Sequence, residues 1–264
     1  MEYAVVDRKY LVTSLLVCNN CHLYYRHPHD KEDFNLKFYQ DEYKETGITT
    51  DLPLADRLQE MKASNFRNSE KDFQRIIKLI QCLLKNIQEI KIVDYGSSWG
   101  YGSYQFLNAG MSVQSFEISS GRADFGNKNL GLNIQKDEKL LEPGNHVFFS
   151  SHVIEHHPDI FSMNVLAKKL LLNDGFYIAF CPNGSNEFRE RDPKAFHHLW
   201  GLVHPNYLND KFFQYVYSEN PYFIGSNPYN FEQLQNWDGH SQFVGDLTGV
   251  ELFVISRPNI KIKN

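Results

Sequence analysis

The sequence predicts an α/β fold built on a mostly parallel sheet. Strand-like and helix-like segments alternate from residue 91 to residue 183, and a strongly amphipathic helix precedes them at 72–87. Such alternation is typical of parallel strands joined by right-handed helical crossovers. Residues 1 to about 55 lack it and are rich in Tyr, Asn, Asp and His, so we expect a small irregular N-terminal extension.

The elements follow in order from local patterns. In DFQRIIKLIQCLLKNI (72–87), apolar residues recur at helical spacing on one face, which predicts a helix. Short apolar runs predict five strands: KIVDYG (91–96), SVQSFEIS (112–119), LNIQK (132–136), NHVFFSSHV (145–153) and FYIAFCPN (176–183).

Helices are expected between and after these strands. The helices predicted at 101–110 and 159–175 each end on a glycine, which is a common helix stop. A helix is also expected at 119–131 and another at 206–217, and ELFVISRP (251–258) predicts a last, antiparallel strand.

Composition excludes several classes of protein. The chain has 264 residues and a net charge of −5, whereas a nucleic-acid-binding surface is normally basic. Four cysteines, two of them isolated, do not suggest a disulfide scaffold, and we expect a reducing compartment. No apolar stretch has the length of a membrane span and the N-terminus does not look like a signal peptide, so we expect a cytoplasmic protein.

The first predicted strand leads into a glycine-rich loop, VDYGSSWGYG (93–102). Gly96 and Gly100 lack a Cβ, so a ligand can lie close to the backbone there. In an α/β sheet, ligands bind where strands end at their carboxyl side, and the following helix N-terminus offers free N–H groups. The spacing fits neither G-x-G-x-x-G nor a P-loop; it fits D-x-G-x-x-x-G, from Asp94 to Gly100.

An acidic residue, Glu117, ends the second predicted strand. A carboxylate at that point can accept hydrogen bonds from both hydroxyls of a ribose. The loop and Glu117 together therefore predict a nucleoside-containing cofactor. A plain turn from strand to helix is the alternative interpretation of the loop.

From about residue 66 to 258 the sequence resembles the class I S-adenosylmethionine-dependent methyltransferases. The resemblance rests on the loop, on Glu117, on SSHVIEHHPD (150–159), which is similar to an H-V-L-E-H segment, and on GFYIAFCPNG (175–184). LVCNNCHLYYRHP (16–28) followed by FYQDEY resembles the C-x-x-C leader of one bacterial branch, with one cysteine pair where two are common.

The resemblance implies a Rossmann-like sheet of seven strands and S-adenosyl-L-methionine as cofactor. It implies an extension at 1–65 and a methyltransferase domain at 66–264. It also implies cofactor contacts in three segments of the chain: Asp94, Tyr95, Gly96, Ser97, Ser98 and Gly100; Glu117 and Ile118; Ser151 and His152.

Histidines near the fourth and fifth predicted strands are candidate catalytic groups. His152, Glu155 and His156 follow the fourth strand, and an imidazole can take a proton from an acceptor hydroxyl or amine. Glu155 and His156 could equally fix a helix start, and His152 could be a pocket wall. FHHLWGLVHPNYL (196–208) adds His197, with His198 and His204 beside it, as candidate bases or as part of an aromatic-rich packed loop.

No metal is expected. Cys18 and Cys21 have the spacing of half a zinc site, but no second C-x-x-C is present, so a remnant of a zinc ribbon is the preferred interpretation.

The expected function is methylation of oxygen or nitrogen on a small-molecule or glycan-type acceptor, by a protein that does not act on nucleic acid. One alternative is a binding module that kept the fold and lost the chemistry, since Ser98 and His146 depart from the family pattern. Another is a nicotinamide-dependent oxidoreductase, which the glycine spacing disfavours. The sequence predicts no oligomeric state.

Overall fold

The computed structural model describes residues 3–29, 51–157, 159–201 and 204–262. The chain forms two compact units, Asp33–Phe149 and Met1–Glu32 with Ser150–Asn264. We call the first the central unit and the second, which contains both ends of the chain, the terminal unit. The FYQDEY segment of the leader lies outside the described residues. The predicted domain boundary near residue 65 remains a prediction.

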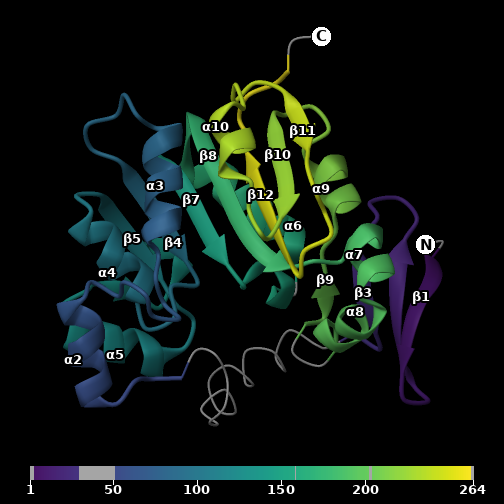
Figure 1. The fold of residues 1–264 in the computed structure, drawn as a ribbon, viewed down its shortest axis with the longest axis horizontal. Coiled ribbons are helices and arrows are strands. Elements are labelled where there is room, and N and C mark those ends of the chain that lie inside the picture. Colours follow the sequence, from purple (N-terminus) through teal and green to yellow (C-terminus); the bar gives the residue numbers. More distant parts are fainter. Residues whose placement is uncertain (1–2, 30–50, 158, 202–203, 263–264) are drawn as a thin grey trace. The chain divides into compact units, whose positions relative to one another are not determined.

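The central unit contains the parallel strands. They are β4 (Lys91–Tyr95), β5 (Ser112–Phe116), β6 (Ile134–Gln135) and β7 (Asn145–Ser151), which crosses into the terminal unit. Their order is β7-β4-β5-β6, and β4 pairs in parallel with both β5 and β7 (Figure 1). The carboxyl ends of β4 and β5 therefore lie side by side.

The described helices of the central unit are α2 (Ala55–Ala63), α3 (Gln74–Leu83), α4 (Tyr101–Asn108), α5 (Ser120–Leu130) and the 3₁₀ turn η2 (Glu138–Leu140). Of these, α3, α4 and α5 correspond to predicted helices. α3 is the predicted amphipathic helix, and its buried residues are Ile77, Leu79 and Ile80. After α4, Gly110 has φ 82°, which agrees with the predicted glycine stop.

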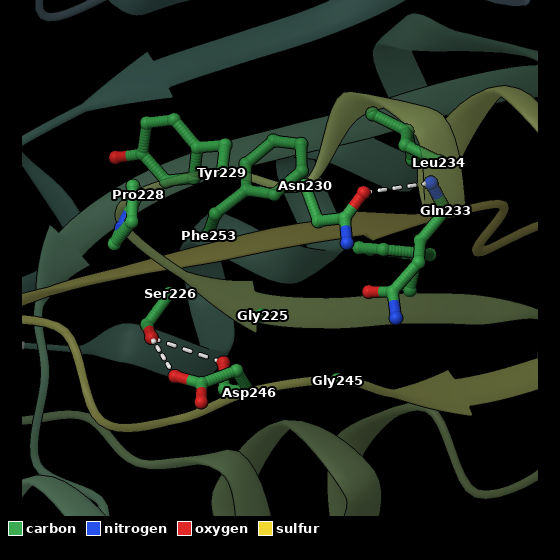
Figure 2. Close-up of a pocket in the computed structure, with 11 residues that line it drawn as sticks. Gly225, Ser226, Pro228, Tyr229, Asn230, Gln233, Leu234, Gly245, Asp246 and Phe253 are labelled. Atoms are coloured by element: carbon green, nitrogen blue, oxygen red, sulfur yellow. Dashed lines mark hydrogen bonds between the residues drawn. The ribbon is translucent and has the colours of Figure 1, made fainter.

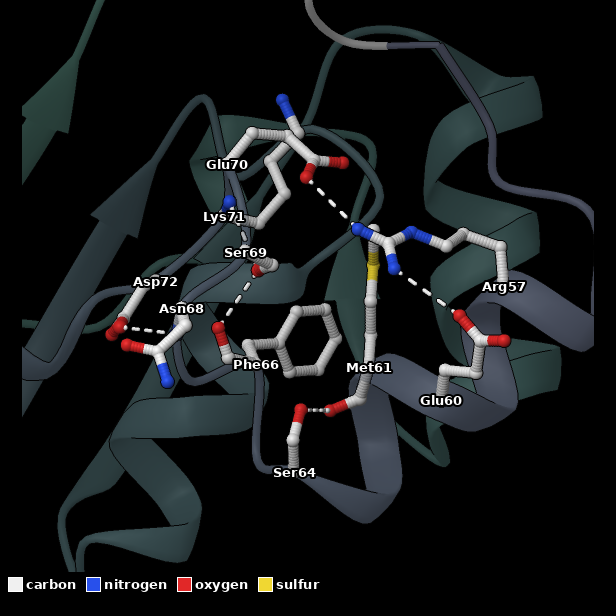
Figure 3. A network of polar contacts seen from close by, with 10 residues as sticks. All are labelled: Arg57, Glu60, Met61, Ser64, Phe66, Asn68, Ser69, Glu70, Lys71 and Asp72. Atoms are coloured by element: carbon white, nitrogen blue, oxygen red, sulfur yellow. Dashed lines mark hydrogen bonds and ion pairs between the residues drawn. The ribbon is translucent and has the colours of Figure 1, made fainter.

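The connection from α2 to α3 packs on the glycine-rich loop. Phe66, which is fully buried, lies 5.9 Å from the ring of Trp99, in a cluster with residues of α2 and α5. Arg57 joins α2 to the connection through an ion pair with Glu70 at 3.2 Å, and it forms a second ion pair within α2, with Glu60, also at 3.2 Å (Figure 3). The buried side chain of Trp99 therefore packs the loop against the rest of the central unit.

The terminal unit contributes the remaining strands of the main sheet. They are β8 (Leu171–Pro182), β10 (Tyr222–Ser226), β11 (Gln242–Val244) and β12 (Glu251–Ser256), in the order β11-β10-β12-β8. β12 is antiparallel to both neighbours, as predicted. In the described part of the chain the main sheet thus has eight strands, and the prediction of seven was wrong. Two of them, β10 and β11, match none of the predicted segments, and β11 is a three-residue edge strand too short to give a sequence pattern.

The predicted helix at 159–175 ends earlier than expected. α6 spans Ile160–Leu170 and β8 starts at once, at Leu171. Asn259 Nδ2 donates to the carbonyls of Lys168 (3.0 Å) and Leu172 (3.4 Å), so these groups at the helix end have a partner. Gly175 is therefore inside a strand and is not the helix stop.

The N-terminal part is not irregular, and this correction is the largest. Strands β1 (Tyr3–Lys9), β2 (Thr13–Cys18) and β3 (Tyr24–His27) form an antiparallel sheet with β9 (Asn206–Tyr207). A buried cluster holds this sheet against helices α7 (Asn186–Arg191) and α8 (Pro193–Leu199). Its members are Leu15, Tyr24, Phe188, Phe196, Trp200 and Tyr207. The sheet needs partners some 180 positions later in the chain, which local patterns do not reveal.

The remaining described helices of the terminal unit are short. They are η3 (Ile154–His156), α9 (Asp210–Val216) and α10 (Phe231–Gln235). α9 is the helical part of the segment predicted at 206–217. Within the described residues, no helix is long and apolar enough to cross a membrane.

Candidate functional site

The glycine-rich loop turns sharply at the carboxyl end of β4. Gly96, Ser98 and Gly100 have φ of 79°, 53° and 82°, all in the left-handed region. The backbone N–H groups of Gly96 and Ser97 both donate to the carbonyl of Phe116 on β5, at 2.8 and 2.9 Å. The loop is therefore held over the ends of two adjacent parallel strands, where the fold class predicts ligands.

Glu117 lies directly beside this loop. Its carboxylate accepts from the backbone N–H of Ser98 (Oε2, 2.8 Å) and of Ser119 (Oε1, 2.8 Å), and the residue is only 8% exposed. Burial raises the pKa of Glu117, while the N–H donors and the Arg122 guanidinium oppose the rise. A carboxylate has about four acceptor sites, so two remain for a ligand.

Two neighbours of the loop have explicit structural partners. Asp94 Oδ2 accepts from Ser103 Oγ at 2.6 Å, and burial, with a smaller effect of Glu117, raises the pKa of Asp94 to about 6. The hydroxyl of Tyr95 donates to Glu138 Oε2 at 2.6 Å. Both residues thus hold the end of β4 in place. Ile118, half-buried, follows Glu117.

One serine in the loop lacks an internal partner. The Oγ of Ser97 is buried, and no residue in the described part of the chain makes a hydrogen bond with it. Ser98 Oγ, in contrast, accepts from Arg122 at 3.3 Å. An orphaned buried hydroxyl next to a left-handed turn fits a site in which a ligand supplies the missing hydrogen bond.

The second group of predicted residues lies in the terminal unit. Ser151 is half-buried at the end of β7, and His152, with φ 55°, turns the chain while its N–H donates to the carbonyl of Phe180 (2.8 Å). This turn leads into η3, which carries Glu155 and His156.

His152 lies between two carboxylates. Its Nε2 is 2.5 Å from Glu251 Oε1 and its Nδ1 is 3.4 Å from Glu155 Oε1. Glu251 also accepts a hydrogen bond from the Tyr229 hydroxyl. Burial opposes protonation of His152, but the two carboxylates raise its pKa well above the usual value. Because 49% of the side chain is exposed, water screens both pairs and makes that rise smaller.

Glu155 is the buried member of this group. Its side chain is 0% exposed, and burial opposes its ionisation. The imidazoles of His152, His156 and His204 outweigh that effect and lower the pKa of Glu155 to about 2. The carboxylate is thus ionised at neutral pH among three histidines.

His197 is placed elsewhere in the terminal unit. Its Nδ1 is 2.8 Å from Asp7 Oδ2 of β1, and the same oxygen accepts from Trp200 Nε1 at 2.9 Å. Burial opposes the ionisation of Asp7, but these two donors and the backbone N–H of Arg8 outweigh it, so the pKa of Asp7 is lowered. The structure therefore brings together His152, Glu155 and His156, and it joins His197 to the N-terminal sheet instead.

The sequence names His204 as one of several candidates in its segment without singling it out. It gives Glu251 only as the start of a predicted strand, so this member of the histidine group is not predicted. His204 has no local signal that separates it from His197 and His198. Glu251 lies 99 positions from His152, so only the tertiary fold brings them together.

The two cysteines of the leader are both free thiols. Cys18 ends β2 and Cys21 lies in the following turn. Within the described residues, no third Cys, His, Asp or Glu lies close enough to complete a metal site with them.

A separate pocket of about 170 Å³ lies between β10, β12 and α10 (Figure 2). Tyr229 and Phe253 form part of its apolar wall, and Ser226 and Asp246 lie at its polar end. Asp246 Oδ1 already accepts from Thr248 N and Oγ1, at 2.8 and 2.7 Å. None of the predicted site residues lines this pocket.

Comparison with known proteins shows the fold. The chain is similar to the plantazolicin methyltransferase BpumL in complex with SAH, with a TM-score of 0.52 and 16% identity, over 88% of this chain and 96% of that one. For BpumL in complex with a monoazolic desmethylPZN analog and SAH, the TM-score is 0.53 and the identity 15%, over 88% of this chain and 96% of that one. For the plantazolicin methyltransferase BamL in complex with a triazolic desmethylPZN analog and SAH, the TM-score is 0.52 and the identity 13%, over 79% of this chain and 90% of that one.

No protein-family model and no curated protein matches the chain. At 13–16% identity, the likeness to solved structures establishes the architecture only. The chain has the α/β fold of these methyltransferases, with a mostly parallel sheet, and the predicted fold class is confirmed at that level.

Proposed function

We propose that the chain is a methyltransferase that uses S-adenosyl-L-methionine. The observation that carries the proposal is the pairing of the β4–α4 loop with Glu117 through the 2.8 Å bond from Ser98 N. A buried carboxylate with free acceptor capacity, beside a left-handed glycine turn, suits a ribose and its attached amino acid. The structures of similar fold contain SAH, which supports this choice of cofactor.

The residues proposed to hold the cofactor are those of the sequence prediction. Glu117 binds the ribose hydroxyls, and Gly96, Ser97 and Ser98 contact the methionine part. The orphaned Ser97 hydroxyl is the group best suited to a new hydrogen bond. Asp94 supports the loop without contacting it through a new bond, since its carboxylate already accepts a hydrogen bond from the Ser103 hydroxyl. Tyr95, Gly100 and Ile118, with Ser151 and His152, complete the proposed set.

The reaction is transfer of a methyl group to an oxygen or nitrogen of a small-molecule or sugar-containing acceptor. The carbon–sulfur bond of the sulfonium breaks, its electron pair returns to sulfur, and the acceptor loses a proton. We propose His156 as the group that takes this proton. Glu155, whose Oε1 lies 4.0 Å from His156 Nε2, would stabilise the resulting imidazolium by its charge, and His152 is a neighbouring positioning group. His197, bound to Asp7, is the weaker candidate for the base.

Departures from the family pattern do not favour an inactive module. His146 Nδ1 accepts from the backbone N–H of Lys91 (3.0 Å), so this residue supports the start of β4. The hydroxyl of Ser98 is likewise bonded, to Arg122. Each substitution thus has a structural function that leaves the loop able to bind.

Calorimetric titration with S-adenosylmethionine and with SAH tests the proposal. We expect one site per chain, weakened by roughly 10–100-fold in Glu117→Ala, since lost hydrogen bonds to a ribose cost on the order of 1–3 kcal/mol. Glu142→Ala, which removes an exposed carboxylate of the same unit, is the matched control.

The titration separates the alternatives. Binding of NAD in place of S-adenosylmethionine would support the oxidoreductase. Absence of binding to all three compounds by a folded wild-type protein would support the binding module and overturn the proposal.

A further inference from the structure

Three side chains of the terminal unit converge on one point. A carboxylate oxygen of Glu155 and one ring nitrogen each of His156 and His204 all lie within 4.8 Å of one another. Two imidazoles and a carboxylate are a common ligand set for divalent transition metals. The sequence predicts no metal, so the cluster must be argued from its geometry.

Glu155 is poorly satisfied by protein groups. It is fully buried, and within the described residues neither of its oxygens has a hydrogen bond of acceptable geometry. The imidazole nitrogens around it are 3.4 Å (His152 Nδ1) and 4.0 Å (His156 Nε2) away. A buried carboxylate normally has close donors or a bound cation, because its desolvation is costly.

His204 is oriented as a metal-bound histidine would be. Its Nδ1 lies 2.5 Å from the carbonyl oxygen of Leu199, which can only accept, so Nδ1 carries the proton. The lone pair is therefore on Nε2. A backbone carbonyl that fixes the ring and tautomer in this way is the usual support of a metal-ligating imidazole.

His156 is the member through which solvent can reach the cluster of Glu155, His156 and His204. Its ring lies 4.8 Å from that of His204, centroid to centroid, at 47°. Its side chain is 14% exposed, so the group is near the surface while Glu155 forms its buried floor. η3 is held at its exit, because Asn206 Nδ2 donates to the carbonyl of His157 at 2.8 Å.

We propose that Glu155, His156 and His204 bind a divalent first-row transition metal ion with one or more open coordination positions. Ligand atoms around a tetrahedral ion at about 2.1 Å are about 3.4 Å apart, so small side-chain rotations close the 4.8 Å group. The open positions suit an oxygen ligand, whose pKa the ion would lower. That the oxygen belongs to the methyl acceptor rests on the proposed function; the metal site itself does not. With the ion bound, His156 is a ligand, and the lowered pKa of the oxygen ligand takes the place of the base proposed above.

Metal binding by the full chain is the direct test. After chelator treatment, Co²⁺ and Zn²⁺ are titrated without any cofactor, with calorimetry for stoichiometry and the visible spectrum of Co²⁺ for the ligand field. We expect one ion per chain, with affinity lowered roughly 100-fold in His204→Ala and in Glu155→Gln. His240→Ala removes an exposed histidine and should bind as the wild type does.

Two further arms keep the outcome clear. Cys18→Ser/Cys21→Ser should retain the ion; loss of binding there would place the metal on the thiols and overturn the proposal. If Glu155→Gln fails to fold, His204→Ala decides: it should melt as the wild type does without metal and lose the rise in melting temperature that metal gives the wild type.

Wild-type binding that His204→Ala leaves unchanged, or no binding by the wild type, also overturns the site. Neither result bears on S-adenosylmethionine, which is titrated separately.

Discussion

Substituting Gly100 by alanine should destabilise the fold through packing, whatever binds the loop. A Cβ at this position would lie 2.3 Å from Leu132 Cδ1 and 2.9 Å from Ile134 Cδ1, with φ at 82°. Gly110 provides a matched control, because it has the same φ of 82° and nothing within 4 Å of its would-be Cβ. The two substitutions share the backbone effect and differ in the contact.

The magnitudes follow from these two terms. A left-handed alanine costs about 1–2 kcal/mol, partly offset by the about 0.4–1 kcal/mol that reduced freedom of the unfolded chain returns. Gly110→Ala should therefore lower the free energy of unfolding by about 1 kcal/mol. The new Cβ would meet the ends of two flexible side chains, one of them on the half-buried Leu132, so overpacking adds only about 1 kcal/mol, the low end of its usual range. Gly100→Ala should therefore lower the free energy of unfolding by about 2 kcal/mol.

Urea denaturation of both variants measures the difference, with equal m-values as the check that the unfolded states are comparable. Leu132→Ala combined with Gly100→Ala should recover part of the loss, because it removes the shorter contact. If the two glycine variants agree within about 0.5 kcal/mol, the packing argument is refuted and Gly100 is needed only for its backbone.

Three further predictions concern charged groups. The mutual stabilisation of His152 and Glu155 should be complete between about pH 4.5 and 6.5. Above this window it should be lost as the pH rises through the raised pKa of His152. Below the window it should be lost as the pH falls toward the lowered pKa of Glu155, about 2. Melting of wild type against His152→Ala across pH measures it, and a constant difference would contradict it. Ionisation of buried Asp94 should lower the free energy of unfolding by at most about 3 kcal/mol as the pH rises from 3.8 through about 6, and Asp94→Asn should not show this decrease. If the free energies of unfolding of the two proteins change in parallel with pH, the prediction is wrong. Asp7→Ala should cost roughly 1–3 kcal/mol in urea titration, because it frees two donors, whereas Asp124→Ala, in an exposed ion pair with Lys136, should cost less than about 1 kcal/mol; equal costs would argue against the network.

Local sequence patterns predict several elements of the central unit, because the residues that define each of these elements are neighbours in the sequence. β4 is a short, largely apolar run, and α3 has a complete apolar face, so for these elements period and length suffice. The position of Glu117 beside the loop could also be predicted, because chain order fixes which strand ends are neighbours in a parallel sheet.

The terminal unit is different because its elements depend on distant partners. β3 pairs with β9 at Tyr24↔Tyr207, and His152 meets Glu251 only through the pairing of β12 with β8. Single segments such as YYRH or ELFVIS do not encode these partners. The H-x-x-E-H segment thus predicts three members of the histidine group, His152, Glu155 and His156. Only the tertiary fold shows which other residues join them.

The glycines of the loop do not all point to a ligand. Cβ atoms at Gly100 and Gly102 would each meet protein atoms closer than 3.0 Å, from Leu132 and Phe73. Packing therefore explains these glycines without any cofactor. What packing leaves unexplained is the buried hydroxyl of Ser97 and the remaining acceptor capacity of Glu117. Substitution of Glu117, rather than of the conspicuous glycines, is for this reason the variant that distinguishes a cofactor site from a well-packed turn.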